Sequence, residues 1–185
     1  MMATPALRRL DANLIAPDAT PAERLLGYGA AASGAAFAVV AGAVAGWQPL
    51  TLVVLGLVAF DIFGGATVNA MDSAKRWWHR PGQTPRHHLA FVAVHVHPFL
   101  IAWATPAFGW WTALAVYLTT LAAAAVVLAT PRPLRRPMGF ALTALSLSII
   151  LAIAHIPAAA AWFVPVLLIK LLLAHLQPEQ LTAGI

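Results

Sequence analysis

Six apolar runs, each long enough to cross a lipid bilayer, limit what this chain can fold into. A helix needs about 20 predominantly apolar residues to cross roughly 30 Å of hydrocarbon. Runs of about this length lie at 24–46, 50–71, 88–105, 110–130, 138–156 and 159–176. Only 9% of the 185 residues are charged, whereas a soluble domain carries about 25%. We therefore expect an all-α polytopic membrane protein in which residues 24–176 form one domain of six transmembrane helices.

The basic residues predict how this domain is oriented. Ten of the eleven Lys and Arg residues lie before or at the start of the first helix, in the second loop and in the fourth loop. Loops 46–49, 105–110 and 156–159 carry no charge. Because cytoplasmic loops are rich in bases, both termini are predicted to be cytoplasmic and the helices to form three hairpins. We expect the protein in the bacterial inner (plasma) membrane.

The segments outside the six helices are short. Residues 6–15 place Leu7, Leu10 and Leu14 on one helical face, which predicts a short amphipathic surface helix within the cytoplasmic segment 1–23. Residues 177–185 are predicted to be a short cytoplasmic tail. We expect no cleaved signal peptide, because no apolar core precedes a small-residue cleavage site. The absence of cysteine excludes disulfides and thiolate metal ligands.

The first helix has a clear start and a face of small residues. Thr20, Pro21 and Glu23 predict an N-terminal capping box. Small residues recur at every fourth position and allow a second helix to approach closely; they are Ala30, Gly34, Ala38, Gly42 and Gly46. We expect this face to pack against another helix of the chain. Self-association as a homo-oligomer through the same face is the alternative.

Ionisable side chains inside two of the apolar runs mark the candidate site. Charged groups at membrane depth are costly and usually functional. Asp61 lies in the second run, and His95 and His97 lie in the third. Helical rise places all three between roughly 10 and 16 Å from the predicted cytoplasmic end. His95 and His97 point in nearly opposite directions in a regular helix, but Pro98 predicts a kink or break at these residues.

These three side chains are predicted to meet at one pocket that opens to the cytoplasmic side. Asp61, His95 and His97 would act there as catalytic acid–base groups or as ligands of a divalent metal ion. Gly64 and Gly65 keep the helix face beside Asp61 shallow enough to admit a ligand or another helix. Further polar groups are predicted to bind the polar or phosphorylated end of a substrate: Asn69, Asp72, Arg76, Arg80 and His88.

Structural roles are expected for several other polar residues. Lys170 is predicted to lie about 9 Å from the inner end of the sixth helix and to extend to the interface. Asp72 is expected to pair with Lys75 and Arg76 at a helix end. The histidines at the ends of the runs are expected to contact lipid headgroups: His79, His87, His88 and His175.

Three functions fit this pattern. The first is a membrane-embedded enzyme that acts on an amphiphilic or lipid-like substrate. The second is a proton- or cation-coupled transporter of a small solute, with Asp61 and His97 as the coupling pair. The third is a membrane protein that serves as an accessory or scaffold subunit. The net charge of +5 lies in short loops, so the expected partners are membrane lipids with anionic headgroups, and no nucleic acid is expected.

Overall fold

The computed structural model describes residues 14–177 as a bundle of helices, and this range contains no strand. Six helical segments are long and apolar enough to cross a membrane: Pro21–Val44, Pro49–Val68, Pro85–Ala104, Trp110–Ala129, Arg132–Ile153 and Ala158–His175. The predicted all-α fold with six spans is thus confirmed. The side of the membrane that each end faces stays a prediction. The predicted surface helix at 6–15, apart from Leu14 and Ile15, and the tail after Gln177 lie outside the described residues.

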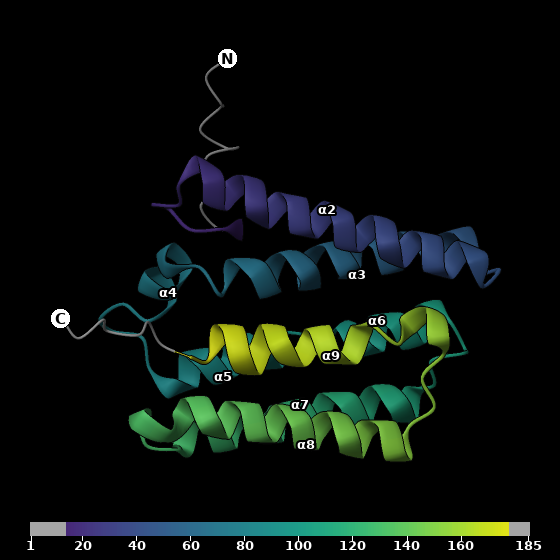
Figure 1. Ribbon diagram of the computed structural model, residues 1–185. Coiled ribbons are helices and arrows are strands. Elements are labelled where there is room, and N and C mark those ends of the chain that lie inside the picture. Colours follow the sequence, from purple (N-terminus) through teal and green to yellow (C-terminus); the bar gives the residue numbers. More distant parts are fainter. Residues whose placement is uncertain (1–13, 178–185) are drawn as a thin grey trace.

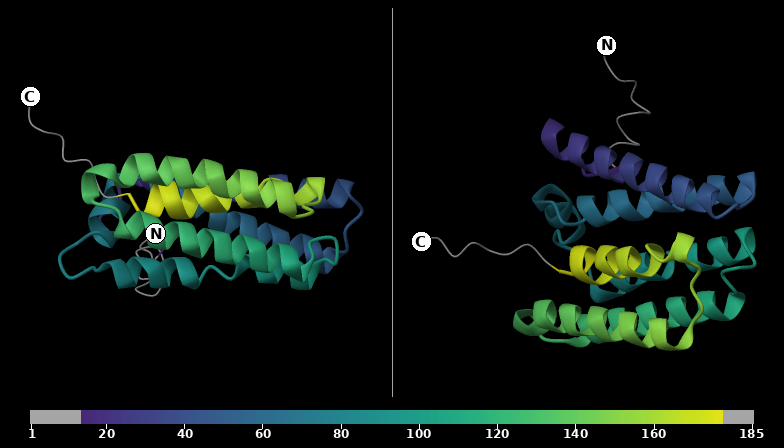
Figure 2. Two further views of the ribbon diagram at one scale, coloured as in Figure 1. Left: turned by 90° about the horizontal axis from the view of Figure 1, so that it is seen from below. Right: turned by 45° about the vertical axis from the view of Figure 1, so that its right-hand side comes forward.

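Two pairs of long helices form opposite sides of the bundle. On one side α2 (Pro21–Val44) packs along α3 (Pro49–Val68), and the short helix α4 (Asp72–Trp78) follows at one end. On the other side α7 (Trp110–Ala129) packs along α8 (Arg135–Ile153). Figure 1 and the right-hand view of Figure 2 show α2 at one edge of the bundle and α7 with α8 at the other.

The two remaining spans lie between these pairs, and neither is a regular α-helix throughout. The third span consists of α5 (Pro85–Ala93) and α6 (His97–Ala104). The sixth span consists of the 3-10 turn η2 (Ala158–Ala160), α9 (Phe163–Leu168) and the π-helical segment η3 (Ile169–His175). This sixth span is the most buried of the six and contacts α3, α7 and α8. It is the centre of the core.

Prolines mark where several helices begin. Pro21, Pro49 and Pro85 each occupy the first position of a helix, where the missing N–H has no helical partner to lose. The capping box predicted for α2 is present. The Glu23 N–H donates to Thr20 Oγ1 at 3.2 Å, and the Thr20 N–H donates to Glu23 Oε2 at 2.7 Å.

The small-residue face of α2 packs against α3 of the same chain. The buried residues on this face are Gly27, Ala31, Gly34, Ala38 and Gly42. A Cβ at Gly34 would lie 2.3 Å from the ring of Phe63, so a side chain there has no room. The predicted close packing is confirmed at positions 34, 38 and 42. Self-association of the protein stays a prediction.

Candidate functional site

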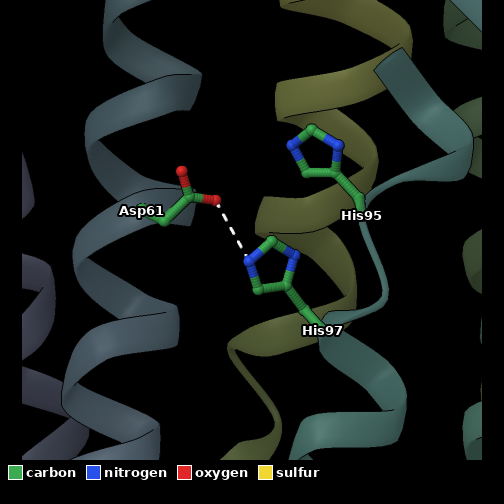
Figure 3. Close-up of side chains that lie close together, drawn as sticks. All are labelled: Asp61, His95 and His97. Atoms are coloured by element: carbon green, nitrogen blue, oxygen red, sulfur yellow. Dashed lines mark ion pairs between the residues drawn. The ribbon is translucent and has the colours of Figure 1, made fainter. Parts of the chain in front are cut away.

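The third span is interrupted immediately before Pro98. The N–H of Val96 donates to the carbonyl of Val94 at 2.9 Å, which is not a helical bond, and α6 starts at His97. Because of this break, His95 and His97 both face α3 (Figure 3). A continuous helix would point them in nearly opposite directions. The predicted kink is thus present as a complete break at residues 94–96.

Two backbone carbonyls released by this break have side-chain partners. The carbonyl of Phe91 loses its helical partner, because the His95 N–H donates to Val92 instead; it accepts the Nδ1–H of His95 at 2.6 Å. The hydroxyl of Tyr117 donates to the carbonyl of Ala93 at 2.9 Å. Unsatisfied backbone groups are costly in a membrane, so these two bonds stabilise the interruption.

Asp61 on α3 meets the two histidines at the break. Nε2 of His97 lies 3.3 Å from Oδ2 of Asp61. One potential ligand atom from each of Asp61, His95 and His97 lies within 4.8 Å of the other two. The predicted convergence of these side chains is confirmed, whereas their catalytic or metal-binding roles stay predictions.

Lys170 is the fourth member of this cluster, and its expected extension to the interface is wrong. Its Nζ lies 2.5 Å from Oδ2 of Asp61 and 3.2 Å from the main-chain carbonyl of the same residue. The Lys170 side chain is only 3% exposed. A Cβ at Gly65 would lie 2.4 Å from Cε of Lys170, so the glycine makes room for the lysine. Pairing with a carboxylate offsets the loss of hydration that would otherwise drive the ammonium to the surface.

The π-helical turn changes which side chains of the buried segment η3 share a face. At about 100° per residue, five residues of α-helix would separate the two side chains by roughly 140°. In η3 the N–H of Leu176 donates to the carbonyl of Leu171, five residues earlier, at 3.2 Å. This wider turn brings residues five apart toward one face. Such π-turns inside helices are frequent at functional sites.

A row of aromatic rings leads from the cluster to the end of the bundle that carries α4. His79 stacks on His88 with ring centroids 4.5 Å apart, and Nδ1 of His88 lies within hydrogen-bond distance of Nε2 of His175, at 3.2 Å. The Nε2–H of His79 donates to the carbonyl of His175 at 3.0 Å. Phe91 stacks on His175 at 3.9 Å and contacts His95 at 4.7 Å. Burial lowers the pKa of His79 below its usual value.

We call these rings the imidazole row: His79, His88, His175 and His95, with Phe91 between the last two. His88 and His175 are both buried, and the expected headgroup contact is wrong for His175, which is only 1% exposed. Their spacing in the sequence gave no indication of the row, because the pairing of His88 with His175 joins residues 87 positions apart.

Several nitrogen atoms in this region have unused hydrogen-bonding capacity. Among the described residues, Nδ1 of His97, Nδ1 of His175 and Nδ2 of Asn69 are buried without a partner. His95 is different, because the Phe91 carbonyl can only accept and therefore fixes the proton on Nδ1. In the neutral ring, Nε2 of His95 therefore carries the lone pair.

An apolar groove of about 100 Å³ borders Asp61. It lies between α2 and α3 and is lined by small and aliphatic residues such as Ile15, Gly27 and Ala31. The Asp61 side chain is 46% exposed, so the carboxylate can be reached from this groove. The remaining groups of the cluster lie deeper in the bundle.

The residues predicted to bind a substrate headgroup do not form a single series. Asn69 ends α3 and is buried. The guanidinium of Arg80 lies 3.9 Å above the ring of Trp77. Asp72 is exposed at the start of α4.

Arg76 and Lys75 also have partners other than the expected Asp72. Nη2 of Arg76 lies 2.7 Å from Oδ2 of Asp18, and this ion pair holds the pKa of the Asp18 carboxyl below its usual value. The ammonium of Lys75 donates to main-chain carbonyls at the end of η3. Burial lowers the pKa of Lys75 to about 8, an effect that Asp72 opposes. Of the predicted binding residues, Arg76 and His88 line a second hollow, described below.

A carboxylate and two imidazoles form a suitable donor set for a divalent transition metal. A tetrahedral zinc ion with ligands at about 2.1 Å would hold the ligand atoms about 3.4 Å from one another. The largest separation between the ligand atoms of Asp61, His95 and His97 would therefore have to decrease. The Lys170 ammonium lies on the same carboxylate oxygen that a metal would use. In this arrangement the ammonium competes with a dication for the Asp61 carboxylate.

Comparison with known proteins assigns no family to the chain. No protein-family model matches it, and no curated protein or solved structure matches it.

Proposed function

We propose that this protein is a proton-coupled membrane carrier of a small solute, in which Asp61 binds the coupling proton. One observation supports this most directly. The same carboxylate oxygen, Oδ2 of Asp61, contacts both Nζ of Lys170 at 2.5 Å and Nε2 of His97 at 3.3 Å. Carboxylates with basic partners inside a membrane bundle are typical of proton relays and coupling sites.

Protonation of Asp61 would change the charge balance of the cluster. With Asp61 ionised and Lys170 protonated, the pair is neutral. When Asp61 takes up a proton, the buried ammonium loses its partner, and an unpaired charge in this position is strongly destabilising. Lys170 must then move, find another acceptor or lose its own proton. Proton binding thus gives the bundle a reason to change conformation, which is what coupling requires.

The two irregular spans support the same proposal. The interruption between α5 and α6 carries His95 and His97, and the π-helical segment η3 carries Lys170. Interrupted helices near the middle of the membrane often form the substrate and ion sites of secondary transporters. Here both irregularities contribute side chains to the Asp61 cluster.

The imidazole row provides a candidate path for the proton. Imidazole accepts and donates protons near neutral pH, and His79 and His88 lie at the end of the bundle. Phe91 separates His175 from His95, so transfer between these two rings requires a bridging water. Nδ1 of His175 is a buried atom with no partner in the described residues, and such an atom could bind that water.

Transport by reconstituted protein tests this proposal. Vesicles containing the purified protein are given a pH gradient, and uptake is measured for labelled amino acids, sugars, organic acids and inorganic ions. We expect at least one class to accumulate, and Asp61→Asn to abolish the accumulation. His155→Ala is the matched control, because His155 is exposed and lies outside the cluster. Undiminished gradient-driven uptake by Asp61→Asn would show that the proposal is wrong.

We also propose that both termini are cytoplasmic and that the membrane is a bacterial plasma membrane. The chain has no cysteine, so a single introduced thiol reports its own side of the membrane. Gln83 lies in a base-rich loop and Ala107 in a charge-free loop, so Gln83→Cys and Ala107→Cys report on opposite ends of the bundle. In intact cells, a membrane-impermeant maleimide should label Ala107→Cys and leave Gln83→Cys unlabelled. The opposite labelling pattern would show that both termini face the outside of the cell.

A metal-dependent enzyme acting on an amphiphile is the second candidate. Two observations favour it. The donor atoms of Asp61, His95 and His97 are close together, and the proton on Nδ1 of His95 leaves its Nε2 free to bind a metal, the usual arrangement for a ligand histidine. The apolar groove beside Asp61 could hold an acyl chain.

Metal analysis separates the two candidates. The enzyme predicts that purified protein contains a stoichiometric transition metal that is lost in both Asp61→Asn and His95→Ala. The carrier predicts loss of transport in Asp61→Asn with no metal in the wild type. If these substitutions lower thermal stability but neither transport nor bound metal is found in the wild type, the scaffold role is favoured.

A further inference from the structure

A hollow of about 510 Å³ lies at the end of the bundle that carries most of the bases. Three segments contribute its walls: α4, the start of α5, and the turn η1 (Arg132–Leu134) that leads into α8. Figure 1 shows α4, α5 and the α7–α8 connection at this same end. The volume lies within the range of small-molecule sites, about 300–1,000 Å³. We call it the basic pocket.

The lining of the basic pocket is strongly cationic. Six basic or imidazole side chains line it: Lys75, Arg76, His79, His88, Arg132 and Arg135. Within the described part of the chain, no lining residue is acidic. Asp18 pairs with Arg76 from outside the wall, and Asp72 lies near Lys75. Two acids therefore lie near four basic side chains, those of Lys75, Arg76, Arg132 and Arg135.

Main-chain carbonyls, rather than carboxylates, hold two of these cations in place. The buried ammonium of Lys75 donates to the carbonyls of Ala174 and Gln177. The guanidinium of Arg135 donates to the carbonyls of Leu128 at 2.9 Å and Thr130 at 3.0 Å. Carbonyls fix the position of a cation without neutralising its charge. The positive charge of these two groups is therefore fixed in place in the wall of the hollow.

We propose that the basic pocket binds a phosphate-bearing anion. Phosphate groups accept several charge-assisted hydrogen bonds, and arginine provides them in a planar fork. The volume exceeds what a single inorganic phosphate fills, which favours a phosphorylated lipid headgroup or a soluble compound with two or more phosphate groups.

The proposal does not depend on the proton-coupled function. The Asp61 cluster lies near the middle of α3, and the pocket lies at the end of the bundle. Asp61→Asn should therefore leave anion binding within twofold of wild type. Failure of the carrier proposal and failure of this one give different results.

Two binding measurements distinguish the sources of the phosphate. In the first, protein in uncharged detergent is titrated with inorganic pyrophosphate by calorimetry. In the second, protein in nanodiscs of phosphatidylcholine with added phosphatidic acid is examined by native mass spectrometry for retained acidic lipid. Arg132→Gln is the test variant, since Arg132 lines the pocket and is exposed. Arg136→Gln is the matched control, because it removes the same charge four residues away, outside the pocket lining.

We expect saturable binding in one of the two measurements. Arg132→Gln should raise the dissociation constant about tenfold or more, because the loss of a hydrogen bond to a charged group typically weakens affinity by at least about this much. Arg136→Gln should stay within twofold of wild type. Binding of pyrophosphate alone identifies a soluble ligand, and retention of phosphatidic acid alone identifies a headgroup. Absence of saturable binding in both measurements, or equal weakening by the two variants, would overturn the proposal.

Discussion

Lys170 and Asp61 are 109 residues apart in the chain, and their side chains form an ion pair with Nζ 2.5 Å from Oδ2. The two partners are not equally buried, since the lysine side chain is 3% exposed and the aspartate 46%. The ammonium therefore depends on the carboxylate more than the carboxylate depends on the ammonium. This asymmetry leads to the first prediction.

Asp61→Asn should destabilise the protein more than Lys170→Met does. Removing the carboxylate leaves a buried unpaired ammonium, at a cost of about 3 kcal/mol. The double variant Asp61→Asn with Lys170→Met should regain most of that loss, because no unpaired charge remains. Unfolding followed by tryptophan fluorescence in detergent measures all three. Strictly additive effects of the two substitutions would show that the pair is not coupled.

Pro98→Ala should remove the constraint that favours the interruption of the third span. His97 is already the first residue of α6, and an N–H at position 98 with no proline ring would give the carbonyl of Val94, four residues earlier, a helical donor. A continuous helix would turn His95 and His97 to nearly opposite faces. We expect thermal stability to change little and gradient-driven uptake to fall at least about tenfold, a barrier change of about 1.4 kcal/mol. Uptake at the wild-type rate would show that the break does not position the histidines.

Lys170→Met should create or strengthen a metal site. The substitution frees Oδ2 of Asp61, beside two imidazoles whose ligand atoms are already within 4.8 Å. Cobalt(II) absorption is a direct measure, since coordination gives visible bands. We expect the variant to bind cobalt at least about tenfold more tightly than the wild type, a difference of about 1.4 kcal/mol. The double variant with His95→Ala is the control and should lose the gain.

The stability of the protein should rise with pH between about 8 and 10.5. Burial lowers the pKa of Lys75 to about 8 in the folded protein, from 10.5. Between these values the unfolded chain binds more protons, so the free energy of unfolding increases with pH. The full gain is about 3 kcal/mol, reached above the unfolded pKa. Thermal unfolding across this range measures how steeply stability changes with pH. Lys75→Met should reduce this pH dependence. An unchanged pH dependence in that variant would show that other groups cause it.

Gly34→Ala should weaken the contact between α2 and α3. A Cβ at position 34 would lie 2.3 Å from the Phe63 ring, whereas one at Gly29 on the same helix meets nothing within 4 Å. We expect Gly34→Ala to lower stability by about 1–3 kcal/mol. Gly29→Ala is the matched control and should be neutral or stabilising by about 0.5–1 kcal/mol. Equal effects of the two substitutions would show that the predicted clash is relieved by movement of Phe63.

The membrane fold could be predicted from the sequence because the features that determine it lie within short stretches of neighbouring residues. An apolar run of about 20 residues has few alternatives to a membrane helix. The capping box at Thr20 and the helix break at Pro98 depend on neighbouring residues in the chain. The helical depths of Asp61, His95 and His97 follow from counting residues, and with the break they were sufficient to predict that the three would meet.

The roles of Lys170 and His175 were decided by tertiary structure. Extension of a lysine to the interface and pairing with a carboxylate are both reasonable from sequence, and the choice depends on the space beside Gly65. The π-turn that brings Lys170 and His175 toward one face of the sixth span has no signal in the apolar pattern. Its consequence, the contact of His175 with His88, joins two distant spans. Local chemistry determined which residues could be charged inside the membrane, and packing determined which partner each of them found.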